Sequence, residues 1–171
     1  MKIKKIMSVF VTGAAGFIGM HVCLKLLKKG NTIIGVDNLN SYYSVKLKQD
    51  RLSLLKKYKK FYFYKCDLNN KKKLNLLFKR FKPNIVLNMA AQAGVRYSIN
   101  HPEKYLKSNI NGFFNILSLS EKHKVKKIIF ASSSSVYGLK NSLSNQENQA
   151  TDKPLSFYAA TKKSNESMAY T

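Results

Sequence analysis

The sequence of 171 residues predicts a doubly wound parallel α/β sheet. Short apolar runs alternate along it with longer segments whose apolar residues recur at helical spacing. Because the apolar runs are not interrupted by polar residues, they are typical of parallel strands that helices cover on both faces. The hydrophobic content is 44%, which is ordinary for a globular protein and excludes wholesale disorder.

The alternation places five strands and five helices in order along the chain. Apolar runs predict strands at residues 6–12, 32–37, 61–67, 84–91 and 126–134. Helical spacing predicts helices at residues 17–29, 45–57, 74–81 and 103–123, and a last helix that starts near Ser156. Gly30 ends the first helix and Pro83 follows the third, since neither residue continues a helix well. The long irregular stretch at residues 139–155 has a length that is typical of functional loops.

The stretch VTGAAGFIG joins the first predicted strand to the first predicted helix. Gly13 allows a sharp turn, Gly16 lets the backbone approach a pyrophosphate, and Gly19 lets the helix pack against the sheet. The helix start, at Phe17 and Ile18, then turns its free amides toward the phosphates. The spacing therefore predicts a dinucleotide site, and the alternative is a turn with a structural role alone.

Asp37 ends the second predicted strand, 24 residues after Gly13. An acid at this place is suited to hydrogen-bond the hydroxyls of the adenosine ribose, and it repels a 2′-phosphate. The cofactor predicted by this pair of features is NAD rather than NADP.

Other residues near strand ends have both a ligand and a structural interpretation. Asp67 and Leu68, after the third strand, are candidates to contact adenine, and the alternative for Asp67 is a cap of the strand end. Ala90 and Ala91 are small enough for a cofactor to lie against the fourth strand, and the alternative is tight packing. Asn109, inside the long predicted helix, would hold a water or kink a turn, and the alternative is a surface asparagine.

The fifth strand leads into ASSSSVYG, where four serines follow at the carboxyl end of the strand. In an open α/β sheet this edge is where ligands bind, so the hydroxyls are expected to meet a ligand or the last helix. The alternative is a loop that is simply rich in hydroxyls. In the last helix Tyr158 and Lys162 are four residues apart, which places both on one helix face.

These motifs together resemble the extended short-chain dehydrogenase/reductase family. The resemblance rests on TGAAGFIG, the strand-ending Asp, NMAAQAGVRYS, ASSSSVYG and Tyr-x-x-x-Lys. Within the NAD-dependent epimerases and dehydratases, DNLNSYYSVKLKQDRL, AAQAGVRYSINHPEKY and SFYAATKKSNESMAYT are most similar to UDP-glucuronate 4-epimerases. The resemblance implies an NAD-binding Rossmann domain at residues 5–171. Because family members are longer, we expect this domain to be incomplete, as an N-terminal fragment without its C-terminal substrate-binding domain.

The family mechanism would give the last helix the central role. Tyr158 would take the proton from the sugar 4-hydroxyl, and hydride would pass from C4 to NAD and return to the other face. A free tyrosine has a pKa of about 10, so Lys162 would lower the cost of the phenolate and would also hold the nicotinamide ribose. Ser133 would contact the 4-hydroxyl, with Ser134 and Ser135 as neighbours on the substrate side.

The resemblance also separates epimerases from sugar 4,6-dehydratases. Dehydratases of this superfamily carry an Asp-Glu pair where this chain has Ser134 and Ser135, so elimination would lack its acid and base. Arg96 would face the UDP-sugar, although a structural role fits it equally well. The family pattern further assigns to the cofactor the residues Asn38, Gln92 and Ser132.

Three functions stay open from the sequence. The first is a UDP-sugar 4-epimerase, for UDP-glucuronate or for the UDP-glucose/UDP-galactose pair, which the family implies to be a cytoplasmic homodimer. The second is an NAD-binding module without catalysis. The third is a nucleic-acid-binding protein, which only the net charge of +23 favours.

Composition argues against nucleic acid, membrane and metal partners. The 31 basic residues include only three arginines and are spread along the chain, which favours a compositional bias over a binding function. The apolar residues 6–24 contain three glycines, so a strand, turn and helix explain them better than a membrane span or signal peptide. Two cysteines and three scattered histidines suggest neither a disulfide nor a metal site, so a reducing cytosol is expected.

Overall fold

The computed structural model describes residues 7–139 and 144–171. The predicted starts of the domain and of the first strand, and residues 140–143 of the predicted loop, lie outside the described residues. The chain divides into two compact units. We call Met1–Ala90 with Asn115–Phe130 the sheet unit, and Ala91–Phe114 with Ala131–Thr171 the helix unit.

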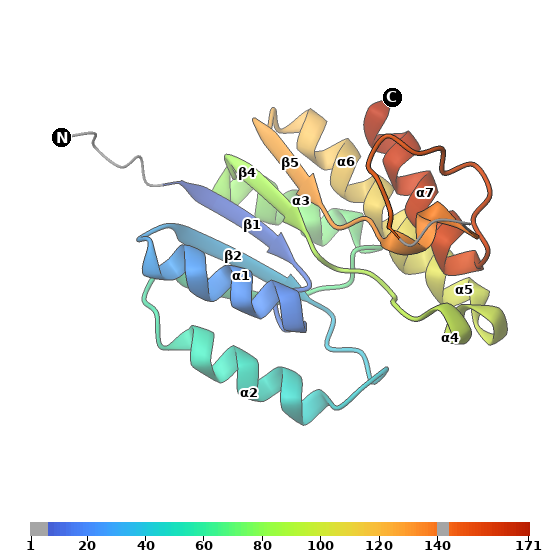
Figure 1. The fold of residues 1–171 in the computed structure, drawn as a ribbon. Coiled ribbons are helices and arrows are strands. Elements are labelled where there is room, and N and C mark those ends of the chain that lie inside the picture. Colours follow the sequence, from blue (N-terminus) through green and yellow to red (C-terminus); the bar gives the residue numbers. More distant parts are fainter. Residues whose placement is uncertain (1–6, 140–143) are drawn as a thin grey trace. The chain divides into compact units, whose positions relative to one another are not determined.

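The sheet unit contains a parallel sheet of five strands in the order β3-β2-β1-β4-β5. Figure 1 labels four of them, β2, β1, β4 and β5, side by side. The strands are β1 Ser8–Thr12, β2 Thr32–Asp37, β3 Phe61–Lys65, β4 Ile85–Asn88 and β5 Lys127–Phe130. The strand order reverses between β1 and β4, and ligands bind beside such a reversal in open α/β sheets. The predicted fold class is confirmed.

The later strands end earlier than the sequence predicted. β1 stops at Thr12 because the chain turns at Gly13, and Thr12 pairs with Asn88, the last residue of β4. Asn88 in turn pairs with Phe130, where β5 ends. β4 and β5 therefore end where the neighbouring strand stops supplying hydrogen bonds. The apolar pattern of a strand's own residues does not reveal this end point.

Helices cover both faces of the sheet (Figure 1). Helices α1 Phe17–Lys28 and α2 Val45–Lys56 pack on one face, against Val9 and Val11. Helices α3 Lys71–Phe81 and α6 Gly112–Lys122 pack on the other, against Phe10. This alternation of side chains across β1 is expected for a strand that is buried on both faces.

The helix unit is built from short helices and the last long one. It contains α4 Val95–Asn100, α5 Pro102–Tyr105, the π-helical segment η1 Leu106–Asn111, the 3₁₀ turn η2 Ser134–Tyr137 and α7 Phe157–Tyr170. The predicted helix at 103–123 is thus realised as three consecutive segments, α5, η1 and α6. The predicted start of the last helix is confirmed, because Ser156 Oγ accepts a hydrogen bond from the Ala159 amide and caps α7.

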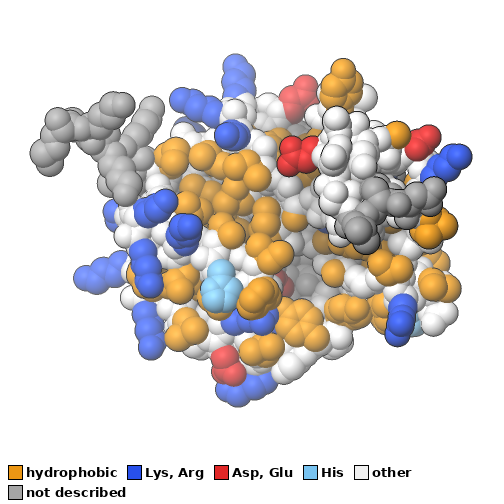
Figure 2. Space-filling view, in the orientation of Figure 1, with side chains coloured by type: hydrophobic (Ala, Val, Ile, Leu, Met, Phe, Trp, Pro, Cys, Tyr) orange, Lys and Arg blue, Asp and Glu red, His pale blue; other side chains and the backbone are white. Residues whose placement is uncertain are grey.

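Lys and Arg side chains are scattered over the face that Figure 2 shows, and they do not gather into one continuous patch there. Among the described residues, no helix combines the length and the apolar character needed to cross a membrane. Within the same residues, no three His, Cys, Asp or Glu side chains are grouped so that they could hold a metal ion.

Candidate functional site

The turn between β1 and α1 leaves no room for side chains at two of its glycines. Gly13 has a φ of +67°, and a Cβ built on it would lie 2.8 Å from the Ala90 backbone nitrogen. A Cβ on Gly19 would lie 2.0 Å from the carbonyl oxygen of Gly13. Both positions therefore require glycine, and α1 starts in direct contact with the turn.

The start of α1 is suited to hold an anion. Within the described residues Gly16, the N-cap, makes no side-chain cap hydrogen bond, and the first turn contains no acidic residue. Phe17 and Ile18 are exposed. Backbone amides and the helix dipole both attract negative charge at such a place. The turn fits the pyrophosphate of a dinucleotide, and the individual contacts of these residues stay predictions.

Asp37, at the end of β2, is tied to the glycine turn. Its Oδ2 accepts a hydrogen bond from the Ala15 amide at 3.1 Å, and its Oδ1 accepts one from the Leu39 amide at 2.8 Å. A carboxylate has about four acceptor positions, so these two bonds leave capacity for ribose hydroxyls. The acid thus holds the turn in place and is also suited to the predicted ribose contact.

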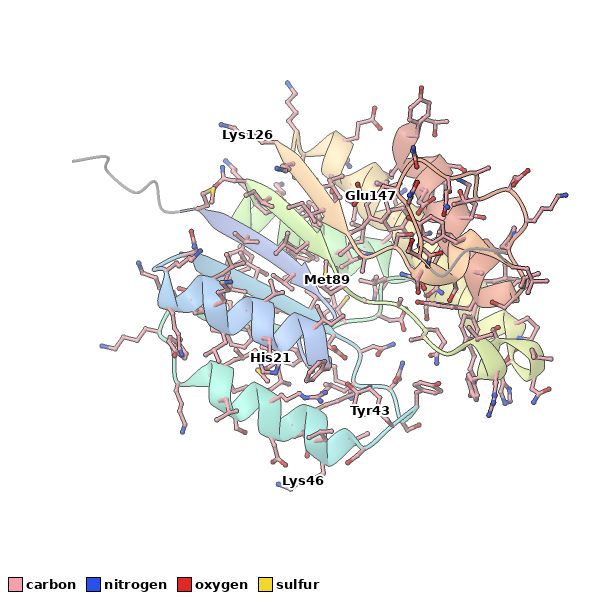
Figure 3. The ribbon with its side chains drawn as sticks, viewed as in Figure 1. His21, Tyr43, Lys46, Met89, Lys126 and Glu147 are labelled. Carbon is pink, nitrogen blue, oxygen red and sulfur yellow. The ribbon has the colours of Figure 1, made fainter. Side chains whose placement is uncertain are left out.

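Thr12 and Asn88 are two buried polar residues that the sequence reasoning missed. The Thr12 hydroxyl donates to Asn88 Oδ1 at 2.7 Å and accepts from the Ala90 amide at 3.1 Å. These bonds hold the chain beyond β4, where Figure 3 labels Met89, against the turn at Gly13. The backbone of Ala90 thus lies close to the turn, its side chain is half-buried, and its contact with a cofactor stays a prediction. The sequence signal that could have revealed them is that each is a polar residue at the end of an otherwise apolar strand, Thr12 in β1 and Asn88 in β4.

Asp67 takes part in the turn that follows β3. Its Oδ1 accepts from the Asn69 amide at 2.9 Å, and its Oδ2 accepts from Asn38 Nδ2 at 2.9 Å. Leu68 is buried, and its carbonyl oxygen accepts from Asn115 Nδ2 at 2.9 Å. The capping role given as the alternative for Asp67 is present, and the adenine contact stays a prediction.

Two basic residues of α2, Lys48 and Arg51, contact the segment that precedes this helix. The sequence reasoning missed them, because lysine is abundant throughout the chain and no single lysine stands out. Lys48 is buried, and its Nζ donates to the carbonyl oxygen and the Oδ1 of Asn40 at 2.7 and 2.8 Å. Arg51 donates to the hydroxyl of Tyr43, which Figure 3 labels, at 3.0 Å. Burial lowers the pKa of Lys48. These contacts order the segment that follows Asp37.

In the helix unit, α7 presents Lys162 to the segment that follows β5. Lys162 is 3% exposed, and its Nζ donates to the Ala131 carbonyl oxygen at 2.8 Å. Burial lowers the pKa of Lys162 to about 8, because the charged form loses its hydration. Tyr158, one turn earlier, is half-buried and its ring lies edge-on to that of Tyr105 at 6.1 Å.

The four serines have different environments. Ser133 Oγ accepts from the Ser135 amide at 3.2 Å and so caps η2. Ser134 is exposed and Ser135 is half-buried. Ser132 donates its hydroxyl hydrogen to Glu166 Oε1 on α7, and Glu166 was not singled out from the sequence. The serine segment is therefore fastened to α7 through both Lys162 and Glu166.

Asn109 is 2% exposed, so the surface alternative is wrong, and its place in η1 agrees with the predicted kink. Its Oδ1 accepts from the Gln92 amide at 2.8 Å, and its Nδ2 donates to the Gln92 carbonyl and to Thr161 Oγ1, both at 3.0 Å. The Asn109 carbonyl accepts from Asn165 Nδ2 at 2.6 Å. These bonds offset the weaker backbone geometry of a π segment.

Ala91, Gln92 and Arg96 lie in the segment that these bonds order. Arg96 is exposed on α4, and Ala91 is half-buried. Gln92 is buried, and its Nε2 is one of two buried polar side-chain atoms without a hydrogen-bond partner among the described residues. Their contacts with a cofactor or a substrate stay predictions.

The predicted site residues thus fall into two groups. Those of the sheet unit gather around the ends of β1 to β4, namely Gly13, Gly16, Phe17, Ile18, Gly19, Asp37, Asn38, Asp67, Leu68 and Ala90. Those of the helix unit lie on α7 or in segments of the same unit that hydrogen bonds connect to it, namely Ala91, Gln92, Arg96, Asn109, Ser132, Ser133, Ser134, Ser135, Tyr158 and Lys162. The first group suits a nucleotide, and the second offers a phenol, an ammonium group and hydroxyls for proton transfer.

The chain is similar to known proteins over nearly its whole length. The family model described as GDP-mannose 4,6 dehydratase matches residues 10–171. Protein CapI of Staphylococcus aureus is 52% identical over 165 residues, which are 96% of this chain and 49% of that protein. UDP-glucuronate 4-epimerase 6 of Arabidopsis thaliana is 46% identical over 166 residues, 96% of this chain and 36% of that enzyme. The chain therefore spans half or less of the length of these relatives.

A solved structure extends the similarity to the fold. The UDP-glucuronic acid 4-epimerase of Bacillus cereus, in complex with UDP-glucuronic acid and NAD, has a TM-score of 0.87 and 33% identity. The match covers 96% of this chain and 51% of that one. The chain belongs to the family of NAD-dependent epimerases and dehydratases that the GDP-mannose 4,6 dehydratase model describes, and it is close to the UDP-glucuronate 4-epimerases.

Proposed function

We propose that this chain supplies the NAD-binding and catalytic residues of an epimerase that inverts C4 of UDP-glucuronate. The relatives that carry this activity in their names support the substrate. The observation that carries the chemistry is the hydrogen bond from Lys162 Nζ to the Ala131 carbonyl. It fixes the helix of Tyr158 and Lys162 to the segment that leads to Ser133, so the three catalytic candidates belong to one compact unit.

The glycine turn is the feature that fits NAD. A Cβ at Gly13 or Gly19 would collide with backbone atoms, and α1 begins at the turn with no acidic residue in its first turn. Asp37 would bind the adenosine ribose, and Lys162 the nicotinamide ribose. When bound, NAD would take up the C4 hydrogen of the sugar as hydride and return it, so that it is not consumed.

Tyr158 would accept the proton of the sugar 4-hydroxyl and give it back after the sugar has turned. Lys162 is still mostly protonated at neutral pH, because its pKa of about 8 lies above 7. Its positive charge would stabilise the phenolate of Tyr158 one helical turn away. Ser133 would hydrogen-bond the 4-oxygen and keep it beside the phenol.

The name of the matching family model raises dehydration as another reaction. Elimination needs a group that protonates the leaving hydroxyl and one that removes the C5 proton. The two positions after Ser133 are Ser134 and Ser135, whose hydroxyls are much weaker general acids and bases than carboxyl groups. These residues support epimerisation.

The first test uses the purified chain, which is denatured so that the supernatant can be assayed for NAD. The native chain is then incubated with UDP-glucuronate and, separately, with UDP-glucose, together with the C-terminal half of a UDP-glucuronate 4-epimerase, because the chain spans about half of the length of such an enzyme. We expect bound NAD in the chain by itself, and formation of UDP-galacturonate when the C-terminal half is supplied. Tyr158→Phe and Lys162→Met should lower turnover by about 10³-fold, the scale of a lost proton-transfer group, while NAD stays bound to the Tyr158→Phe variant.

Tyr170→Phe is the matched control, because Tyr170 lies on the same helix and is 94% exposed. Turnover of UDP-glucose alone would move the proposal to the other UDP-sugar epimerases. NAD binding without turnover of either sugar would leave an NAD-binding module and contradict the proposed activity of this chain. The homodimer, the cytoplasmic location and a separate substrate-binding domain remain predictions from the family resemblance.

A further inference from the structure

Ser98 is a buried serine in the short helix α4, two residues after Arg96. It is 0% exposed, although Val95 and Ile99 of the same helix are exposed. Its hydroxyl donates to the Val95 carbonyl at 2.6 Å, which is a common local bond for a helical serine. The same oxygen also accepts a hydrogen bond from the Tyr158 amide at 3.2 Å, across 60 residues of sequence.

The Tyr158 amide needs such an external partner. It is one of the first four amides of α7, and these have no acceptor within their own helix. Ser156 at the N-cap accepts from Ala159 instead. Ser98 therefore contributes to the capping of α7 from another helix, and the residue it caps is the proposed catalytic tyrosine.

The ring of Tyr158 is held by the same part of the chain. Tyr105 lies edge-on to it at 6.1 Å, and the Tyr105 hydroxyl lies 2.8 Å from the Ala93 carbonyl oxygen and 2.6 Å from that of Gly94. Gly94 has a φ of +103°, so the segment before α4 adopts a conformation that these contacts must maintain. The backbone of Tyr158 thus contacts Ser98, and its ring contacts Tyr105. Both residues hold the segment that contains Arg96 in its conformation.

We propose that Ser98 is a positioning residue, which fixes Tyr158 relative to the segment of Arg96 so that substrate contacts there align the phenol for proton transfer. The inference rests on the proposed function, since it assigns Tyr158 as the catalytic base. Ser98 itself would not touch the reacting atoms. A misplacement of a reacting group by about 1 Å can cost about 10²-fold in rate, so a single hydrogen bond at this place has a measurable effect.

The test compares Ser98→Ala with Ser98→Thr, which keeps a hydroxyl. Ser164→Ala is the matched control, because Ser164 lies on α7, is exposed, and its hydroxyl donates back to the Ala160 carbonyl of the same helix. Bound NAD, kcat and KM for UDP-glucuronate, and amide hydrogen exchange at Tyr158 are measured for each. For Ser98→Ala we expect kcat to fall by at least about tenfold, with KM and bound NAD within about twofold, and faster exchange of the Tyr158 amide. Ser98→Thr should recover most of the kcat.

Parental kcat in Ser98→Ala, or a loss that Ser98→Thr does not recover, would overturn the inference. If Ser98→Ala does not fold, Tyr105→Phe replaces it, since that change keeps the ring and removes only the hydroxyl; it should lower kcat in the same direction. If the parent chain itself shows no turnover, the proposed function fails on its own. The exchange data then decide: unchanged protection of the Tyr158 amide in Ser98→Ala contradicts the positioning bond, and faster exchange confined to the start of α7 and to α4 supports it.

Discussion

Lys162 shows how one buried charge determines a pH response. Burial lowers its pKa from 10.5 to about 8. Below pH 8 the lysine is protonated in both the folded and the unfolded chain, so the folded state bears the full cost of a buried charge. Between pH 8 and 10.5 the folded chain releases the proton while the unfolded chain keeps it. The stability contributed by this group therefore rises with pH across that window and is lost again as the pH falls through 8.

Lys162→Met should remove this response. At about 1.4 kcal/mol for each pH unit, the free energy of unfolding of the parent should gain roughly 3 kcal/mol relative to the variant between pH 8 and 10.5. Urea unfolding at pH 7, 8, 9 and 10.5 measures the difference. Taking the difference cancels the opposite trend of Cys23, whose buried thiol has a pKa raised to about 12.

Lys107→Met is the control for this measurement, because Lys107 is exposed in η1. Its difference from the parent should not change with pH. A difference between parent and Lys162→Met that is constant from pH 7 to 10.5 would show that Lys162 is not buried as a charged group.

Gly19 and Gly30 are needed for different reasons, so that variants of the two residues distinguish the effect of close packing from the effect of a positive φ. A Cβ on Gly19 would lie 2.0 Å from the Gly13 carbonyl oxygen, a backbone atom that cannot move away cheaply. Gly30 has a φ of +85° but nothing within 4 Å of an added Cβ. We expect Gly19→Ala to lower the free energy of unfolding by roughly 3 kcal/mol or more, and Gly30→Ala by about 1 kcal/mol.

The same two variants test the cofactor site. Gly19→Ala should lose bound NAD, because the turn and the start of α1 must separate, whereas Gly30→Ala should retain it. Denaturant titration and the assay of released NAD measure the two effects. Equal NAD retention by both variants would mean that the glycine turn is not the cofactor site.

At the scale of elements, the π-helical segment η1 is where the side-chain bonds of the helix unit converge. Asn109→Ala would leave the Gln92 amide and carbonyl and the Thr161 hydroxyl without these bonds. Each buried polar group that is left unpaired costs about 1–3 kcal/mol, so we expect a total loss of roughly 3 kcal/mol after relaxation. Asn111→Ala, at an exposed position of the same segment, should cost less than about 0.5 kcal/mol.

Urea unfolding of the two asparagine variants gives the comparison, and amide exchange locates the change. In Asn109→Ala the exchange of α7 and of the Gln92 amide should become faster, while the strands of the sheet unit should stay protected. Similar losses of stability in both variants would indicate that the π segment is maintained by its backbone and not by Asn109.

The sequence predicted the five strands and the helices α1, α2, α3 and α7 in their order, because each carries its own apolar pattern, but it did not predict the short helix α4 or the turn η2. It did not predict where β4 and β5 end, since those ends depend on Thr12 and Asn88 in neighbouring strands. It also missed the start of α3 at Lys71, because three lysines carry no apolar pattern and the cap is the side chain of Asn70.

The candidate site divides in the same way. Glycine spacing, Asp37 and the Tyr158–Lys162 pair could be read from local sequence. Asn88, Ser98 and Glu166 could not, because their partners Thr12, Tyr158 and Ser132 are 76, 60 and 34 residues away in the chain. Residues that bind through their own motif are visible in a sequence, whereas residues that position others become visible only when distant segments meet.

At the scale of the whole molecule, the charge of +23 is poorly compensated. Acidic residues number eight, and the described residues contain three ion pairs, one of which involves a histidine. Exposed ion pairs of this kind contribute little to stability. Repulsion among the lysines therefore opposes the compact state, and it is strongest when few salt ions are present to screen it.

Added salt should consequently stabilise this protein. Raising sodium chloride from about 0.01 M to about 0.2 M shortens the screening length from roughly 30 Å to below 10 Å, so the thermal midpoint should rise by several degrees. A variant with Lys56, Lys57 and Lys59 changed to Gln removes three exposed charges and should show a smaller rise. A midpoint that falls with salt would contradict the repulsion argument, because it would mean that attractive ion pairs, and not excess positive charge, dominate the electrostatic energy of the fold.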